Sequence, residues 1–354
     1  LYYMQADLLA TAQHVLSGGK TVYSPVWGTV VLTAMLLLLQ GLCHKLLDFP
    51  MRFYALGYFP SCLVLGLITS VVPAGEGGVK WAVNWWLVGV CAALYVLLVW
   101  VVKHFPDMKS GRTFAFSYLW PNFLLFFLSF AMTGSVACTD DVCHYRLQAE
   151  RLIAEGRDEE ALEVGRNSLH ADRSLTAMRA FALSRMRTMG GRLFEYPQYY
   201  GSEGLIPALS DTIYVHQWTD SLYVHLGGKP GKGLDGADEF LEVLSRLPSA
   251  TQAVGDYLLC ALLLDKRLDD FVAALPRFYP VDGNLPLHYK EALVLYNRLH
   301  TSPALIYKDD AVGANMDDFA SYEAQFSNPV ERANQCRRMY GHTYWWYYYY
   351  QALP

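Results

Sequence analysis

The side chains of this chain that could bind an anion lie close to its C-terminal end. Arg337 and Arg338 are adjacent, and His342 follows shortly after them. A guanidinium group offers a planar fork of N–H donors that matches a carboxylate or a phosphate. Trp345 and Trp346 come next, and rings of this kind suit a membrane interface. These five residues are the candidate binding site, and the alternative is ordinary solvated surface charge.

A second set combines acids with imidazoles: Asp211, His216, Asp220 and His225. On a helix, residues four positions apart share a face, as His216 and Asp220 would. Such a set could hold a metal ion or transfer protons. A solvated helix face is the simpler interpretation and the one we favour, so we assign no catalytic residue, metal or cofactor.

The stretch Gly227 to Gly236 contains Gly-Lys-Pro-Gly-Lys-Gly, which superficially suggests a phosphate-binding loop. No Ser or Thr follows Lys232, and no predicted strand precedes the stretch. We interpret it as a flexible loop.

Two cysteines, Cys138 and Cys143, flank the end of the last apolar stretch. They could form a disulfide on an oxidising side of the membrane. On one continuous helix this spacing would direct their Cβ atoms apart and exclude the bond, so both outcomes stay open.

Four long stretches contain no Asp, Glu, Lys or Arg: Thr21–His44, Phe53–Gly75, Trp81–Val102 and Thr113–Thr139. Each is long enough to cross a bilayer, which takes about 20 apolar residues. Their strongest polar groups are Gln40, His44, Asn84 and Asn122. Helix-to-helix hydrogen bonds or interfacial positions explain such groups. The spans are expected to act as an anchor and not as a coupled transporter.

Charge separates the two halves of the chain. Residues 1–138 carry 7 basic and 4 acidic residues, whereas the remaining 216 carry 21 basic and 29 acidic residues. The second half has no cluster of positive charge, which excludes nucleic acid as a partner.

Basic residues near the spans predict the orientation. Five of them follow the first and third spans: Lys45, Arg52, Lys103, Lys109 and Arg112. The loop between the second and third spans has only Lys80, beside Glu76. By the positive-inside rule, residues after Asp140 lie on the outer side. Leu1 is not an initiator, so we expect at least one helix to precede it.

The segment Tyr145 to Asp172 resembles a tetratricopeptide repeat. Gly156 stands at the turn between two helices, Glu160-Ala161-Leu162 opens the second helix, and that helix is expected to continue to Leu169. Gly190 follows Gly156 by 34 residues, the period of that family. The resemblance implies stacked helical hairpins that bind peptides or proteins.

Further helices are predicted over Ala237–Leu247, Leu258–Leu264, Leu268–Leu275 and Pro286–Leu299, with a capping box of Ser249 and Gln252 before the second. The pattern predicts an α-solenoid. Seven consecutive aromatic residues, Tyr344 to Tyr350, lie near the C-terminus. They are too dense to be buried on one helix face. We predict a helix over Thr343–Tyr350, capped by Thr343, that closes the repeat stack.

The order of elements, with the closing Tyr-Gly-His-Thr-Tyr-Trp-Trp-Tyr, resembles an uncharacterised family of multi-pass bacterial envelope proteins that has no assigned activity. We therefore predict an all-α protein with a transmembrane domain, residues 1–139, and an extracytoplasmic helical-repeat domain, residues 140–354. It would lie in a bacterial inner membrane, contact lipids and dock a protein partner in the periplasm. The alternative is a membrane enzyme of the lipid-linked sugar transferase or polymer ligase type, so enzymatic activity stays open.

Overall fold

The computed structural model describes residues 6–18, 20–74, 78–104, 116–207, 218–230, 236–281 and 284–353. The chain divides into two compact units, residues 1–147 and 148–354, and the segment 212–215, outside the described residues, is counted with the first. The boundary expected after residue 139 falls just before a helix, α6 (Asp141–Ala154), whose first half belongs to the first unit.

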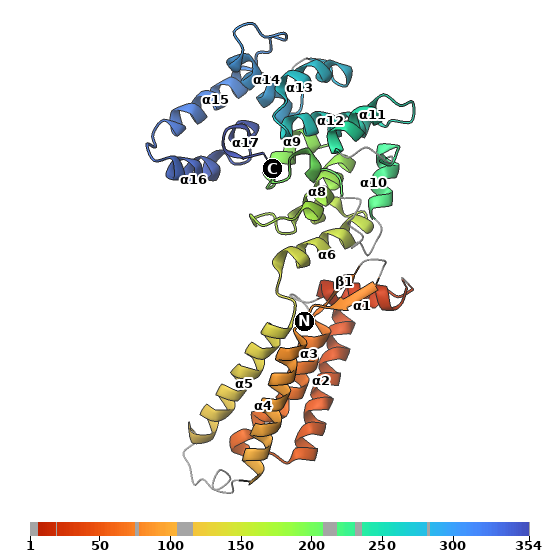
Figure 1. The fold of residues 1–354 in the computed structure, drawn as a ribbon, viewed down its shortest axis with the longest axis vertical. Coiled ribbons are helices and arrows are strands. Elements are labelled where there is room, and N and C mark those ends of the chain that lie inside the picture. Colours follow the sequence, from red (N-terminus) through yellow and green to blue (C-terminus); the bar gives the residue numbers. More distant parts are fainter. Residues whose placement is uncertain are drawn as a thin grey trace. The chain divides into compact units, whose positions relative to one another are not determined.

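The first unit is a bundle of apolar helices with a small hairpin at one end (Figure 1). Its elements are α1 (Ala6–Leu16), α2 (Pro25–Leu47), the 3₁₀ helix η1 (Met51–Tyr58), α3 (Phe59–Ile68), β1 (Val71–Ala74), β2 (Gly78–Trp81), α4 (Trp85–His104) and α5 (Phe116–Val136). The strands pair antiparallel, with Val71 opposite Trp81.

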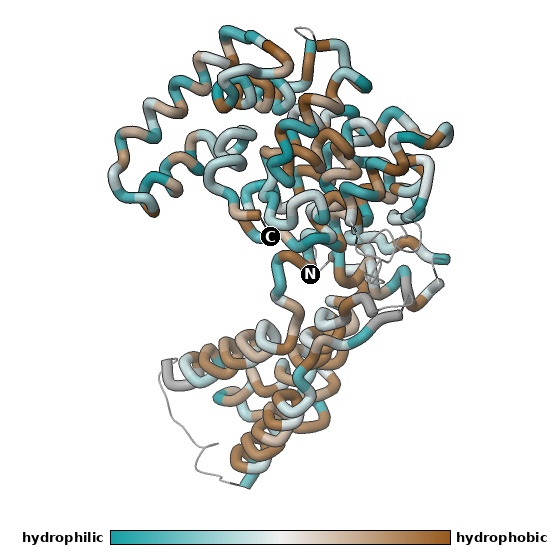
Figure 2. Tube along the Cα trace, turned by 45° about the horizontal axis from the view of Figure 1, so that its top comes forward, coloured by the Kyte–Doolittle hydropathy of each residue, from teal (hydrophilic) through white to brown (hydrophobic). Residues whose placement is uncertain are grey.

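Four of these helical segments could span a membrane by length and composition: Pro25–Leu47, Met51–Ile68, Trp85–His104 and Leu119–Val136. Hydrophobic residues predominate along these segments, which Figure 2 colours brown, and many of their large apolar side chains are exposed. Leu38 is 74% exposed and Phe130 is 66% exposed. Such a surface is costly in water and suits a hydrocarbon solvent, in which the backbone must form its hydrogen bonds internally.

The second span is not the continuous α-helix that its uncharged sequence suggests. It begins as η1, in which Phe53 has a non-helical φ of −127°, and continues as α3. Asn122 of α5 supports this irregular backbone. Its Oδ1 accepts a hydrogen bond from the Ala55 N–H at 2.8 Å, and its Nδ2 donates to the Met51 carbonyl at 2.7 Å. The Asn122 side-chain amide therefore provides hydrogen-bond partners for two backbone groups that would bond within the helix if this segment were regular.

The second unit contains the rest of α6 and the helices α7 (Asp158–Glu163), α8 (Arg173–Arg185), α9 (Met189–Arg192), α10 (Trp218–Leu226), α11 (Ala237–Ser245), α12 (Gln252–Leu264), α13 (Leu268–Ala274), α14 (Leu287–Leu299), α15 (Asp310–Glu323), α16 (Pro329–Tyr340) and α17 (Tyr344–Tyr350). Short 3₁₀ turns lie at η4 (Leu193–Glu195), η5 (Gly201–Gly204) and η6 (Leu275–Arg277). The core is centred on α12, which is buried from Tyr257 to Leu264.

Three helix pairs share one turn geometry. Gly156 between α6 and α7, Arg187 between α8 and α9, and Lys266 between α12 and α13 all have positive φ. In each pair the next residue's N–H bonds the carbonyl five positions earlier, as in Arg157 to Leu152. This is the Schellman motif, which closes a helix and reverses the chain within a few residues. Helical hairpins with a common turn are therefore a repeated feature of the second unit.

Two local predictions were wrong. The helix α7 ends at Glu163 and does not reach Leu169. The Arg179 side chain is 2% exposed, and its Nη2 donates to the carbonyls of Val164 and Gly165 at 3.0 and 3.1 Å. These carbonyls therefore bond to a side chain and not to the N–H groups of a continuing helix. The capping box before α12 is also absent, because Thr251 is the N-cap and its hydroxyl donates to the His225 carbonyl.

The predicted aromatic helix is present as α17, and the Thr343 hydroxyl caps it by accepting from the Trp346 N–H at 3.3 Å. The expectation that so dense a run could not be buried was only partly right. Four consecutive side chains, Tyr344 to Tyr347, are buried, whereas Tyr349 is 46% exposed. Glu291 of α14 fixes the start of the helix, since its carboxylate accepts from the Tyr344 N–H at 2.8 Å.

We expect Tyr344→Ala to lower the free energy of unfolding by about 3–5 kcal/mol, the range for truncating a buried large aromatic side chain. Thermal unfolding of the detergent-solubilised chain measures the effect. The matched control is Tyr349→Ala, whose cost should be near the ~0.5 kcal/mol of surface substitutions. Equal effects of the two changes would show that α17 is not packed as described.

Candidate anion-binding pocket

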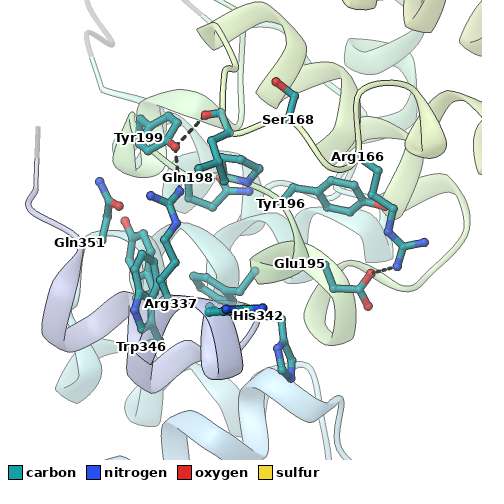
Figure 3. A pocket seen from close by; sticks show the side chains of 16 residues that line it. Arg166, Ser168, Glu195, Tyr196, Gln198, Tyr199, Arg337, His342, Trp346 and Gln351 are labelled. Atoms are coloured by element: carbon teal, nitrogen blue, oxygen red, sulfur yellow. Dashed lines mark hydrogen bonds and ion pairs between the residues drawn. The ribbon is translucent and has the colours of Figure 1, made fainter. Parts of the chain in front are cut away.

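A pocket of about 270 Å³ lies between α16, α17 and the segment that follows α7 (Figure 3). Its lining residues are Arg166, Ser168, Leu169, Phe194, Glu195, Tyr196, Pro197, Gln198, Tyr199, Arg337, Arg338, Gly341, His342, Trp346, Tyr347 and Gln351. All of them belong to the second unit.

Arg337 is a cation of this pocket whose partners are uncharged. Its Nη2 donates to the Tyr199 hydroxyl at 3.0 Å, and that hydroxyl donates to the Leu169 carbonyl at 2.7 Å. The guanidinium carbon lies 5.3 Å from the centroid of the Trp346 ring, which is a cation–π contact. These neutral partners fix the direction of the guanidinium without cancelling its charge.

Most arginines of this unit are neutralised by carboxylates. Arg166, in the same pocket, pairs with Glu163 and Glu195, and Arg298 pairs with Asp317. Among the described residues, no carboxylate lies within salt-bridge distance of Arg337 or Arg338. The pocket therefore retains positive charge that an anionic group could neutralise.

Two buried polar groups at the pocket also have unused hydrogen-bonding capacity. Gln198 is 5% exposed and its Nε2 donates to the Leu193 carbonyl at 3.1 Å, whereas its Oε1 has no hydrogen-bond partner within the described part of the chain. The Trp346 Nε1, likewise buried, has none there either. These two atoms are among several buried polar atoms of the described residues that lack a hydrogen-bond partner.

The predicted site residues do not all come together. Arg337, Arg338, His342 and Trp346 line the pocket, with Arg338 and His342 exposed. Trp345 does not line it: this side chain is 1% exposed, and its ring centroid lies 6.4 Å from that of Phe319. The helical rotation between adjacent residues sends the two tryptophans in different directions.

Sequence reasoning missed Gln198 and Tyr199. Tyr199 and Arg337 are 138 positions apart, and no local pattern links them. Tyrosines that follow a short turn are common, so only a contact across the fold could have shown their role.

Gln351, one of the residues that line the pocket, is bonded to the turn after α12. The Lys266 Nζ donates to the Gln351 carbonyl at 2.6 Å, which connects the turn after α12 to the end of α17. Burial lowers the pKa of this lysine. The Nζ also lies over the rings of Tyr347 and Tyr348, at 5.9 and 5.7 Å.

The acid and imidazole set does not form a site in the described residues. Asp220 pairs with Lys229 at 2.7 Å, and His225 Nε2 is 3.0 Å from the Ser184 hydroxyl. Asp211 and His216 lie outside the described residues, as do Gly231, Lys232 and Gly233 of the Gly-Lys-Pro-Gly-Lys-Gly loop. Within the described part, no group of three or more potential metal ligands occurs.

A membrane enzyme of the lipid-linked sugar transferase or polymer ligase type would need carboxylates on the outer side, and Asp7 and Glu76 are the residues that the predicted orientation offers there. The Asp7 carboxylate is engaged by His144 Nδ1 at 2.7 Å, and Glu76 lies outside the described residues.

Comparison with known proteins covers part of the chain. Residues 235–351 match a family of unknown function, DUF6057. The match includes α11 to α17 and the α16–α17 side of the pocket, but not the spans or the segment that bears Gln198 and Tyr199. No curated protein and no solved structure matches the chain.

We expect Tyr199→Phe to lower the free energy of unfolding by about 0.5–1.5 kcal/mol, because one hydroxyl serves both Arg337 and the Leu169 carbonyl. Tyr349→Phe is the matched control: its side chain is largely exposed, so its effect should be close to zero. Chemical denaturation of the solubilised chain distinguishes the two. An unchanged midpoint for Tyr199→Phe would mean that this hydroxyl does not hold the pocket together.

Proposed function

We propose that this chain is a membrane-anchored helical-repeat scaffold that docks a protein partner in the bacterial envelope. In this proposal the four apolar helices anchor the chain in the inner membrane. The second unit is a tetratricopeptide-like solenoid, lies in the periplasm and presents the pocket to its partner. The proposal assigns no reaction and no cofactor to the chain.

The observation that carries the proposal is Arg337, held in a pocket by an uncharged hydroxyl and an aromatic ring. The second half of the chain has 29 acidic and 21 basic residues, so its net charge is negative. The positive charge at Arg337 is therefore opposite in sign to the net charge of this half. A scaffold that binds an acidic group of a partner would need such a charge.

The pocket fits a carboxylate of a polypeptide, such as a free C-terminus. Arg337 and Arg338 supply N–H donors from which the two oxygens of a carboxylate can accept hydrogen bonds.

The test uses the full chain in detergent with two acetylated tripeptides of one sequence, one with a free C-terminal carboxylate and one amidated. A ligand that binds only the folded state raises the unfolding temperature. We expect the acid to raise it and the amide to have little effect. Arg337→Gln should abolish the shift, and Arg298→Gln, which removes an exposed arginine of α14, should retain it.

Inorganic phosphate and vesicles of anionic lipid are the comparison probes. If phosphate raises the unfolding temperature as much as the acid, and vesicles bind through Arg337, the pocket holds a lipid headgroup and not a protein terminus. If no probe acts through Arg337, the pocket is ordinary surface and the scaffold proposal loses its main support.

The proposed orientation is tested with single introduced cysteines. Ser302→Cys, in the exposed loop between α14 and α15, should react with a membrane-impermeant maleimide in intact spheroplasts. Met51→Cys, at the start of η1, should react only after permeabilisation. Wild-type labelling gives the background from the native cysteines. The reverse pattern would place the second unit in the cytoplasm.

A further inference from the structure

Cys138 and Cys143 meet at the junction between α5 and α6. Cys138 lies in the connection after α5, and Cys143 lies in the first turn of α6, so the two are not on one continuous helix. Cys138 packs against a buried cluster of Leu8, Cys143 and Leu147. Because the chain leaves helical geometry between α5 and α6, the two cysteines lie side by side and are not directed apart as they would be on one helix.

His144 stands beside this pair with both ring nitrogens bonded to acceptors. Its Nδ1 is 2.7 Å from Asp7 Oδ2, and its Nε2 is 3.1 Å from the Cys138 carbonyl oxygen. Neither acceptor carries a hydrogen, so both nitrogens must donate, and the ring is an imidazolium. The Asp7 hydrogen bond accordingly raises the pKa of His144 to about 9.

The two thiols differ in character. Cys143 is 9% exposed, and hydrogen bonding with Cys138 raises its pKa. Cys138 is half-buried, and hydrogen bonding with Cys143 lowers its pKa to about 6. The Asp140 backbone N–H and the His144 charge also lower this pKa, whereas burial and the Asp140 charge raise it. The Arg146 charge, one turn further along α6, acts on the pKa of Cys143 in the lowering direction. A more accessible thiolate thus lies next to a buried thiol.

We propose that Cys138 and Cys143 form a dithiol–disulfide exchange site, with Cys138 as the attacking thiol and Cys143 as the resolving thiol. The substrate class is a disulfide, carried by an oxidoreductase or by a small molecule such as oxidised glutathione. His144 cannot act as the general base for Cys138, because its nitrogens face a carboxylate and a carbonyl. It acts as a fixed positive charge.

The exchange proceeds in two balanced steps. The Cys138 thiolate attacks one sulfur of the donor disulfide, which forms a mixed disulfide and releases one donor thiolate. Cys143 then loses its proton to solvent and attacks the Cys138 sulfur, which closes the intramolecular disulfide and releases the second donor thiolate. The pair is oxidised by two electrons and the donor disulfide is reduced by two.

The experiment treats the full chain in detergent with oxidised glutathione at pH 7, quenches with acid, denatures the chain and counts maleimide adducts on its 7 cysteines. We expect two fewer adducts than in the reduced chain. Cys143→Ala should trap glutathione on Cys138 as a stable mixed disulfide, and Cys138→Ala should trap far less. Cys91→Ala, a change within α4, should still lose two adducts.

A second measurement distinguishes an electrostatic effect of His144 on Cys138 from a general effect on folding. Alkylation of Cys138 by iodoacetamide at pH 7 should slow several-fold in His144→Gln and in Asp7→Asn, and recover as the pH is raised, since the substitution removes charge and not access. Unchanged adduct counts in the oxidised wild-type chain, or equal trapping on Cys138→Ala and Cys143→Ala, would overturn the proposal.

Discussion

The buried aromatic helix α17 is the element on which the second unit depends. Four consecutive side chains can be buried on one short helix only if neighbours surround it, and each neighbour is attached by a polar group as well as by packing. The Tyr347 hydroxyl donates to the Leu264 carbonyl of α12 at 2.7 Å, and the Tyr350 hydroxyl donates to Glu323 of α15 at 2.6 Å. Together with the bond from the Tyr344 N–H to Glu291 of α14, these contacts join helices that are far apart in the sequence. Tyrosine suits this role because it buries a large ring while its hydroxyl finds a partner.

The same helix creates the conditions for binding. With α17 fixed, the Trp346 ring provides a face for the Arg337 guanidinium, and the indole and the Tyr199 hydroxyl orient that group without a counter-ion. A carboxylate partner would have stabilised Arg337 more strongly, since charge-assisted hydrogen bonds are the stronger kind. The arrangement therefore costs some stability but leaves the Arg337 charge available to a ligand. Binding sites often depart in this way from the most stable choice of residues.

Some of this architecture could be predicted from the sequence because its causes are local. The absence of charge over about 20 residues predicts a span wherever it occurs, and Thr343 before an aromatic run predicts the start of α17. Other features arise from contacts across the fold. The early end of α7 reflects Arg179, which reaches back to two carbonyls, and the irregular start of the second span is supported by Asn122, which is 67 positions from Ala55. The helices α15 and α16 were not predicted. The half of the pocket that comes from Gln198 and Tyr199 could not be seen without the fold.

Solvent explains where chemistry can occur in this chain. The four apolar segments that could span a membrane carry Lys and Arg only near their ends, which is the distribution expected for segments in hydrocarbon, where charge is costly. Charged and nucleophilic side chains accumulate instead where the chain leaves the last span. There the backbone departs from a helix between α5 and α6, and this break brings together two thiols that helical geometry would have separated. It also frees the Cys138 carbonyl to accept from His144, whose other nitrogen is held by Asp7 of α1. A break in secondary structure, required anyway at the end of a span, thus becomes the place where a fixed positive charge and two sulfur atoms meet.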